Sequence, residues 1–143
     1  MTAVEIDVLK RKLARIAENL GALKPIREMS HKEYGRDLYK RKATERLLQE
    51  LIEAVVDINL HLISQTGHSI PDDYYQSFIN LGELKIISSD LAEKLAPSAG
   101  LRNRLVHEYD AIVDGLILQS VAMAEDLYAQ YVKEIQDYLS NRC

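Results

Sequence analysis

The chain has 143 residues, of which 47% are hydrophobic and 28% are charged, with six glycines, three prolines and one cysteine. This composition excludes an intrinsically disordered chain and fits one globular domain, residues 1–143, with its own core. The net charge of −4 argues against a bulk electrostatic nucleic-acid binder, although residues 1–50 carry +4 and residues 51–143 carry −8.

The termini and hydropathy indicate where the protein works. The first residues lack a cationic flank followed by an apolar core, so no signal peptide is expected. No apolar run approaches the roughly 18 to 20 residues that span a bilayer. The single cysteine, Cys143, has no partner for an internal disulfide. We therefore expect a cytoplasmic protein without membrane contact.

Two long helices are predicted in the first half of the chain. Apolar residues recur at three- and four-residue steps along 4–23, which predicts a helix closed by Pro25. A second and longer apolar stripe begins after Gly35. It ends near Gly67, which predicts a helix C-terminus there.

Shorter helices are predicted in the second half, before a final long one. Asp72 or Asp73 is placed to cap a short helix that runs to about residue 81. Ser88 marks the next start, Pro97 breaks or kinks the helix that follows, and Asp114 caps the last helix. No segment alternates with period two. We predict an all-α protein, an antiparallel bundle of four main helices with one or two short extra helices.

Tyr128, Tyr131 and Tyr138 lie at helical spacing in the predicted last helix. Such a stripe is more typical of a core or a dimer contact than of a stacking platform for bases. Bundles of this size with wide apolar faces commonly pair, so we expect a homodimer.

The first half also contains a basic stretch that has two interpretations. These side chains can contact phosphates of RNA, or they can form the solvated flank of a helix. The stretch consists of Arg36, Lys40, Arg41, Lys42 and Arg46.

Most familiar catalytic patterns are absent from the sequence. It has no glycine-rich phosphate loop, no H-E-x-x-H, no C-x-x-C and no nucleophile elbow, so neither a metal nor a cofactor is expected. What remains is LRNRLVHEYD, residues 101–110. On a helix Asn103 and His107 share a face, whereas Arg102 and His107 diverge by roughly 140°. The latter pair can converge on one phosphate only across a symmetric interface, or where the helix frays.

These residue types suit phosphodiester cleavage without a metal. A histidine side chain, with an ordinary pKa of about 6.5, can take the proton from an RNA 2′-hydroxyl that attacks the adjacent phosphate. An arginine supplies a fixed fork of donors for the charge that develops on that phosphate. From the residue types alone, an arginine and a histidine on one helix more often have a structural role than a catalytic one.

The segment from Arg102 to Tyr109 resembles the R-x4-H-x-Y motif of HEPN-domain toxins, specifically the HepT family. Arg102 and His107 match the catalytic pair of that family, and Asn103 matches the residue that usually follows the arginine. The resemblance extends over most of the chain, because ERLLQELIEAVVDINLHLIS, SSDLAEKLAPSAGLRNRLVHEYD and the last helix follow the family order.

This resemblance implies an all-helical, homodimeric, metal-independent endoribonuclease with its cleft at the dimer interface and transfer RNA as the expected substrate. It also implies a partner, a minimal nucleotidyltransferase (MNT) antitoxin that transfers AMP from ATP onto Tyr109. The AMP groups would occupy the phosphate site and repel RNA. Members of the family often carry a polar residue near the motif, which implies that Asp57 orients Arg102 or His107. A plain buried hydrogen-bonding role for Asp57 is the alternative.

A second function remains open at the level of the sequence. Related helical domains serve as non-catalytic partners of nucleotidyltransferases, in which case the motif holds a nucleotide or substrate without cutting it. A dimeric scaffold is a third interpretation. A ribonuclease should arrest growth unless its antitoxin is present, and a binding module should not.

Overall fold

The computed structural model describes residues 1–108 and 112–142, so Cys143 lies outside the described residues. The long helices are α1 (Ala3–Arg27), α3 (Leu38–Gln65) and α7 (Asp114–Ser140). The shorter helices are α2 (His31–Arg36), α4 (Tyr74–Glu83), α5 (Ser89–Leu95) and α6 (Ser98–His107). The prediction of an all-α bundle is confirmed, with three long and four shorter helices in the described ranges. None of these helices combines the length and apolarity of a membrane-spanning segment.

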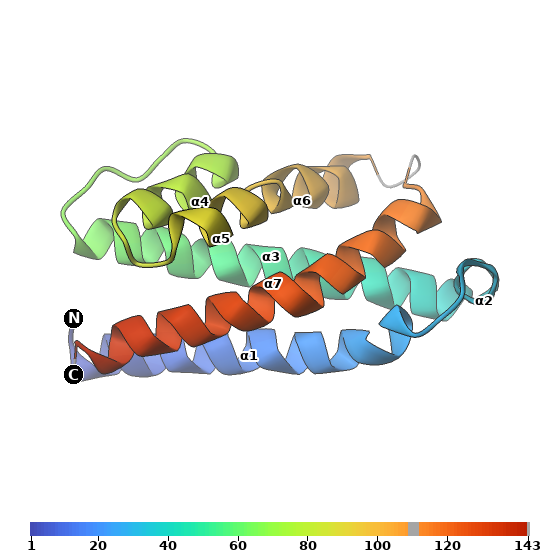
Figure 1. The fold of residues 1–143 in the computed structure, drawn as a ribbon, viewed down its shortest axis with the longest axis horizontal. Coiled ribbons are helices and arrows are strands. Elements are labelled where there is room, and N and C mark those ends of the chain that lie inside the picture. Colours follow the sequence, from blue (N-terminus) through green and yellow to red (C-terminus); the bar gives the residue numbers. More distant parts are fainter. Residues whose placement is uncertain (109–111, 143) are drawn as a thin grey trace.

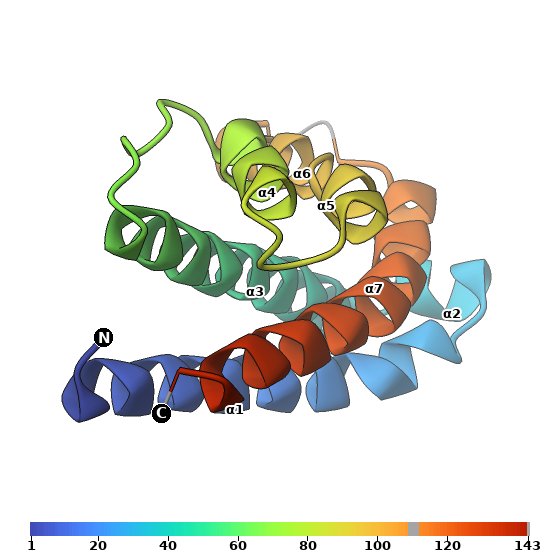
Figure 2. The same ribbon diagram turned by 60° about the vertical axis from the view of Figure 1, so that its left-hand side comes forward.

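The helices form two layers. The long helices α1, α3 and α7 extend along the longest axis of the molecule, with α1 packed against both others (Figure 1). A second layer of α4, α5 and α6 lies on the side away from α1, with α4 and α6 packed against α3 and α5 packed against α4 and α7 (Figure 2). Pro97 separates α5 from α6, as its position predicted. The two chain ends lie together at one end of the bundle, and α2 lies at the other.

Short polar motifs fix several of the helix ends. Asp73 accepts a hydrogen bond from the backbone N–H of Gln76 (2.7 Å), and Ser88 accepts one from that of Leu91 (3.3 Å), as N-caps do. Just beyond α3, Gly67 has a φ of +82°, the left-handed conformation that glycine adopts readily. These three predicted boundaries are confirmed.

Two predicted boundaries were wrong. Pro25 lies inside α1, which continues to Arg27, because Ile26 packs into the core and this burial holds the last turn in place. Asp114 is the first residue of α7 and not its cap. The N-cap is Val113, which has no side-chain capping bond, and Asp114 places a carboxylate near the positive end of the helix dipole.

The predicted tyrosine stripe is part of the core. Tyr128 is 3% exposed and Tyr131 is fully buried, and their rings meet edge to face with centroids 6.1 Å apart. Tyr138 is partly buried, and its ring lies 4.2 Å from the guanidinium carbon of Arg142. The stripe therefore anchors α7 in the bundle and is not available for stacking on bases.

Candidate functional site

Arg102, Asn103 and His107 lie on α6, which has few residues buried in the core. Its buried residues are Ala99 and Leu105. Asn103 and His107 are exposed, and Arg102 is half-buried. The end of α6 therefore presents polar groups to solvent while its other side rests on the bundle.

The guanidinium of Arg102 is held by groups from three helices. Its Nε and Nη2 both donate to Oε2 of Glu53 on α3, at 3.1 and 2.9 Å. The ring of Tyr74, the first residue of α4, lies 5.1 Å from Cζ of Arg102, within cation–π range. Nη1 donates to Oδ1 of Asn103 at 3.4 Å. Because only 20% of the Arg102 side chain is exposed, these contacts are partly shielded from water and fix the orientation of the guanidinium.

A chain of buried hydrogen bonds fixes Tyr74 in turn. The hydroxyl of Tyr131 on α7 donates to Oδ1 of Asn59 on α3 at 2.6 Å. Nδ2 of Asn59 donates to Oγ of Ser77 at 3.2 Å, and that hydroxyl donates to the carbonyl of Tyr74 at 2.7 Å. The polar interior of the bundle is thus connected to the residue whose ring faces Arg102.

Glu53 is the partner of Arg102 that the sequence alone did not identify. The structure brings Glu53, rather than Asp57, to Arg102, whereas Oδ2 of Asp57 lies 3.7 Å from Nζ of Lys12 on α1. Residues four apart on a helix share a face, so periodicity could not separate the two carboxylates. The distinguishing signal is tertiary, since it depends on where α6 crosses α3.

Arg102 and His107 do not converge within one chain. The side chain of Arg102 is turned toward α3. His107 is exposed at the end of α6, and its imidazole has no hydrogen bond or ion pair with a described residue. Tyr109, the expected AMP acceptor, lies outside the described residues. The described side chains include no group of three His, Cys, Asp or Glu residues that could hold a metal ion. The described side chains can therefore supply proton transfer, by the imidazole of His107, and charge stabilisation, by the guanidinium of Arg102.

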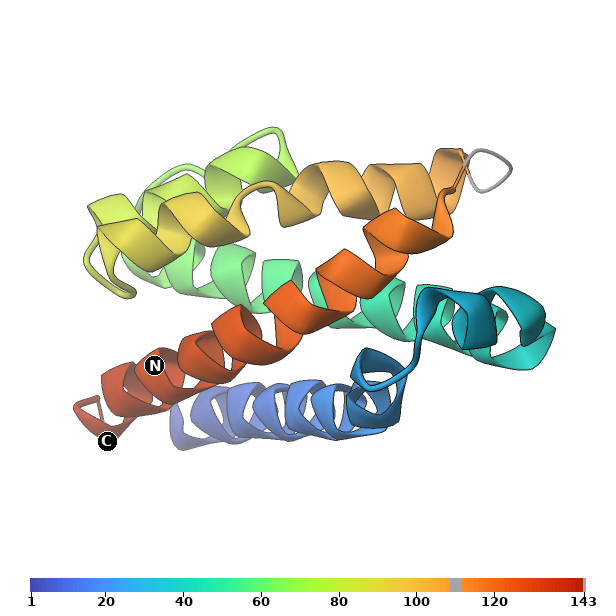
Figure 3. The same ribbon diagram turned by 45° about the vertical axis from the view of Figure 1, so that its right-hand side comes forward.

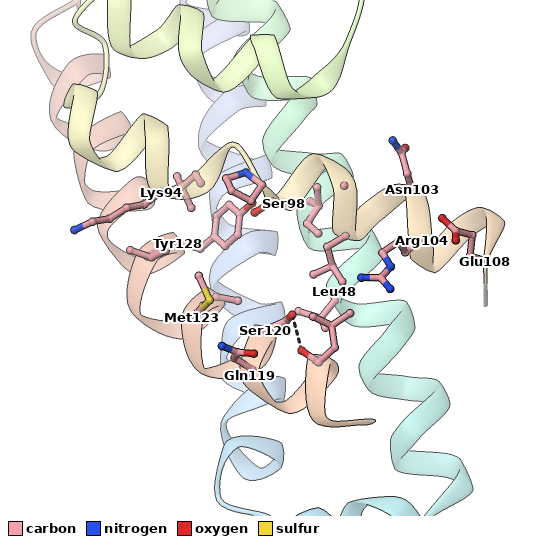
Figure 4. A pocket seen from close by; sticks show the side chains of 18 residues that line it. Leu48, Lys94, Ser98, Asn103, Arg104, Glu108, Gln119, Ser120, Met123 and Tyr128 are labelled. Carbon is pink, nitrogen blue, oxygen red and sulfur yellow. Dashed lines mark hydrogen bonds between the residues drawn. The ribbon is translucent and has the colours of Figure 1, made fainter. Parts of the chain in front are cut away.

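A largely apolar groove of about 650 Å³ lies between α6 and α7 (Figure 4). Its wall includes Leu101 from α6 and Met123 from α7, and Met123 is 48% exposed. Asn103, Arg104 and Glu108 line the groove where α6 ends. The groove therefore joins an apolar surface to the exposed end of the motif helix.

The basic stretch lies at the same end of the bundle as the end of α6. Figure 3 shows α2 and the first turns of α3 at this end, below the end of α6. Two of its cations form exposed ion pairs, Lys40 with Asp37 (4.0 Å) and Arg46 with Glu50 (3.1 Å). Arg41 is partly buried, with its Nε out of contact with water. The structure thus brings the stretch to the motif's end of the molecule, and phosphate contact stays a prediction for Arg36, Lys40, Arg41, Lys42 and Arg46.

A family model and named proteins match this chain at the level of sequence. The family model described as "Ribonuclease HepT-like" matches residues 11–135. A protein of Aphanizomenon flos-aquae named "tRNA nuclease HepT" is 37% identical over 139 residues, which cover 97% of this chain and 95% of that protein. A protein of Shewanella oneidensis named "mRNA nuclease HepT" is 29% identical over 89 residues, covering 62% of this chain and 67% of that protein.

Solved structures share the fold at lower identity. A tri-AMPylated Shewanella oneidensis HEPN toxin in complex with an MNT antitoxin superposes with a TM-score of 0.82 at 23% identity, covering 96% of this chain and 99% of that one. The cytosolic protein YutE of Bacillus subtilis, described as of unknown function, gives a TM-score of 0.83 at 17% identity, covering 95% and 91%. At these identities the superpositions show the fold alone.

Proposed function

This chain belongs to the HepT-like ribonuclease family, and from that premise we propose that it is a metal-independent endoribonuclease and the toxin of a toxin–antitoxin pair. The observation that carries the proposal is the fixed orientation of the Arg102 guanidinium. Glu53 and Tyr74 hold its guanidinium in one orientation on a helix that ends at the exposed His107. A pre-oriented guanidinium and an accessible imidazole on the same short helix are the groups that cleavage of a phosphodiester needs.

In the proposed reaction the RNA supplies its own nucleophile. The imidazole of His107 takes the proton of a ribose 2′-hydroxyl as that oxygen bonds to the adjacent phosphorus. The bond to the 5′-oxygen of the next nucleotide breaks, and this oxygen receives a proton from an imidazolium. The guanidinium of Arg102 stabilises the negative charge that builds on the phosphorane. The side chain of Asn103 accepts a hydrogen bond from Arg102 and lies one helical turn before His107, so it is the proposed supporting residue for both groups.

We propose that the site is completed by a second copy of the chain. Arg102 and His107 lie about 140° apart around α6, so one chain does not direct both at the same phosphate. A symmetric dimer places the arginine of one copy opposite the histidine of the other and supplies the two imidazoles that an acid–base pair needs. The apolar groove between α6 and α7, with the exposed side chain of Met123, offers a contact surface beside the motif.

The antitoxin partner would act on the residue two positions after His107. In the proposed step the hydroxyl of Tyr109 attacks the α-phosphorus of ATP and pyrophosphate leaves, so that AMP becomes joined to the tyrosine. An MNT-type nucleotidyltransferase catalyses this step, and the added phosphate competes with RNA for Arg102. Support comes from the tri-AMPylated toxin that shares this fold. Transfer RNA is the proposed substrate, as the name of the relative from Aphanizomenon flos-aquae suggests. Asp57 is a further proposed supporting residue.

The test is cleavage of total transfer RNA by the purified chain in EDTA, with wild type beside His107→Ala. Intact mass first establishes that the protein carries no AMP. We expect discrete fragments with wild type and a loss on the order of 10² to 10⁴ with the variant, because a general acid–base group contributes that much. An unmodified wild type that cuts no RNA would reject the ribonuclease and favour a non-catalytic partner of a nucleotidyltransferase.

A further inference from the structure

One face of α3 carries an exposed aromatic and cationic stripe that leads to Arg102. Tyr39, Lys42 and Arg46 follow at steps of three and four residues, so they share one side of the helix. Seven residues after Arg46, on the same side, comes Glu53, which holds Arg102. We propose that this α3 stripe, defined as Tyr39, Lys42 and Arg46, is a binding track that guides a single-stranded segment of RNA to the motif.

Tyr39 is the aromatic member of the stripe. Its side chain is 88% exposed, and the neighbouring Leu38 is 54% exposed. The other tyrosines described above pack into the core or against an arginine, whereas the ring of Tyr39 offers a free face to solvent. A free aromatic face beside cations is the surface on which an unpaired base stacks, with little dependence on sequence.

The cations of the stripe are available to phosphates. The side chain of Lys42 is exposed, and its ammonium forms no ion pair or hydrogen bond with any residue in the described ranges. Arg46 pairs with Glu50 at 3.1 Å, but both side chains are largely exposed, at 63% and 47%. An exposed pair of this kind contributes little stability, so a phosphate can replace Glu50 at small cost.

The stripe also separates the basic residues of this region into two groups. Lys40 lies about 160° around the helix from Lys42 and is paired with Asp37 at 4.0 Å. Arg41 points inward, with its Nε buried. Lys40 and Arg41 are therefore off the track, although they belong to the same basic stretch.

The length and chemistry of the track fit a flexible RNA segment. From Tyr39 to Glu53 the helix rises about 21 Å, at 1.5 Å per residue. A stacking ring followed by two cations matches an unpaired base followed by backbone phosphates. A double helix would keep its bases stacked inside and could not use Tyr39 in this way. The ligand class is therefore single-stranded RNA, which includes unpaired ends and loops of a folded RNA.

The experiment measures binding apart from cleavage, since the inference rests on the proposed function. The full chain carrying His107→Ala is titrated against a fluorescein-labelled single-stranded RNA in EDTA, and anisotropy is followed at several salt concentrations. Tyr39→Ala should weaken binding on the order of 5- to 100-fold, and Tyr39→Phe should retain it, because stacking needs the ring alone. Lys42→Ala should reduce the slope of log affinity against log salt by about 0.7, the contribution of one phosphate on a single strand.

Lys10→Ala is the matched control, since it removes one exposed positive charge from α1, near the chain ends and at the end of the bundle away from α2. It should leave the salt slope unchanged. Equal effects of Lys10→Ala and Lys42→Ala, or unchanged binding by Tyr39→Ala, would overturn the track. Loss of neutralisation by a co-expressed antitoxin with RNA binding unchanged would overturn it too, and would assign the stripe to the protein partner. If wild type cuts no RNA but Tyr39 and Lys42 still govern binding, the proposed function fails and the track stands.

Discussion

The consecutive helices α6 and α7 are held in the bundle in different ways. Over 27 residues α7 buries seven side chains, including Tyr128 and Tyr131, whereas α6 buries only Ala99 and Leu105 over ten. Besides these and the partly buried Leu101, α6 is tied to α3 by the ion pair of Arg102 with Glu53. An apolar helix stabilises the fold through area removed from water, and a helix held by a few directed contacts leaves its surface free for chemistry. Substitutions in α7 should therefore change stability, and substitutions in α6 should change activity.

The largest expected effect is alkaline unfolding, which acts on the buried tyrosines. Burial raises the pKa of Tyr34 to about 12 and raises the pKa values of Tyr128 and Tyr131 above the ordinary value. The folded state keeps these phenols neutral, whereas the unfolded chain ionises them near pH 10. The contribution of these tyrosines to the free energy of unfolding is therefore complete below pH 10. It is lost as the pH rises toward their pKa values in the folded state. Each tyrosine should lower the free energy of unfolding by up to about 1.4 kcal/mol per pH unit in that range.

Urea unfolding followed by circular dichroism between about pH 8 and pH 11 measures this loss. Tyr34→Phe is the control, because it keeps the ring and removes one titrating group, and its slope should be shallower by up to one proton. A stability that does not change above pH 10 would contradict the assignment.

The second effect concerns α6 alone. Arg102→Ala should reduce RNA cleavage on the order of 10² to 10³, the cost of removing one transition-state donor. The free energy of unfolding should change by less than about 1 kcal/mol, since the ion pair with Glu53 is partly exposed. Arg102→Lys should not restore activity, because a lysine lacks the planar fork that Glu53 and a phosphate share. Cleavage and urea unfolding are measured on the same preparations, and a large loss of stability would make Arg102 a structural residue.

The third prediction concerns a substitution in α7 that should also change activity at the site. Tyr131→Phe removes the hydroxyl that donates to Asn59 and leaves a buried acceptor without its donor. We expect a destabilisation of about 1–3 kcal/mol. Since the hydrogen-bond chain ends at the carbonyl of Tyr74, activity should fall too, but by less than with Arg102→Ala. Tyr138→Phe, which keeps its ring against Arg142, serves as the control. Equal stability of the two variants would show that the buried chain does not support the fold.

The smallest effect separates two carboxylates on α3. Glu53→Gln keeps an oxygen that can accept a hydrogen bond from Arg102 but loses the negative charge. We expect kcat to fall about tenfold with little change in KM, because a tenfold change corresponds to the free energy of about one hydrogen bond to a charged group. Asp57→Asn should have a smaller effect, because Asp57 contacts Lys12 and not Arg102. Initial rates over a range of RNA concentrations give both constants. A larger loss with Asp57→Asn would place Asp57, and not Glu53, in the site.

Much of the helical order could be predicted from local chemistry. The polar caps Asp73 and Ser88, the left-handed Gly67 and the break at Pro97 depend on contacts within a few residues, and all were recovered. The wrong boundary at Pro25 has the opposite origin. A proline disfavours a continuing helix locally, but burial of Ile26 against distant helices outweighs that preference.

The sequence by itself determined the all-α class, the course of most helices and the motif on which Arg102 and His107 lie, because hydrophobic periodicity and capping are local properties. Only the tertiary structure decided which carboxylate holds Arg102. Glu53 and Asp57 are equivalent along α3, and the choice is made where α6 crosses that helix. The tertiary structure also decided that the end of α6 and the basic first turns of α3 lie at the same end of the bundle. Contacts between residues about 50 positions apart depend on helix packing, and no local pattern records them.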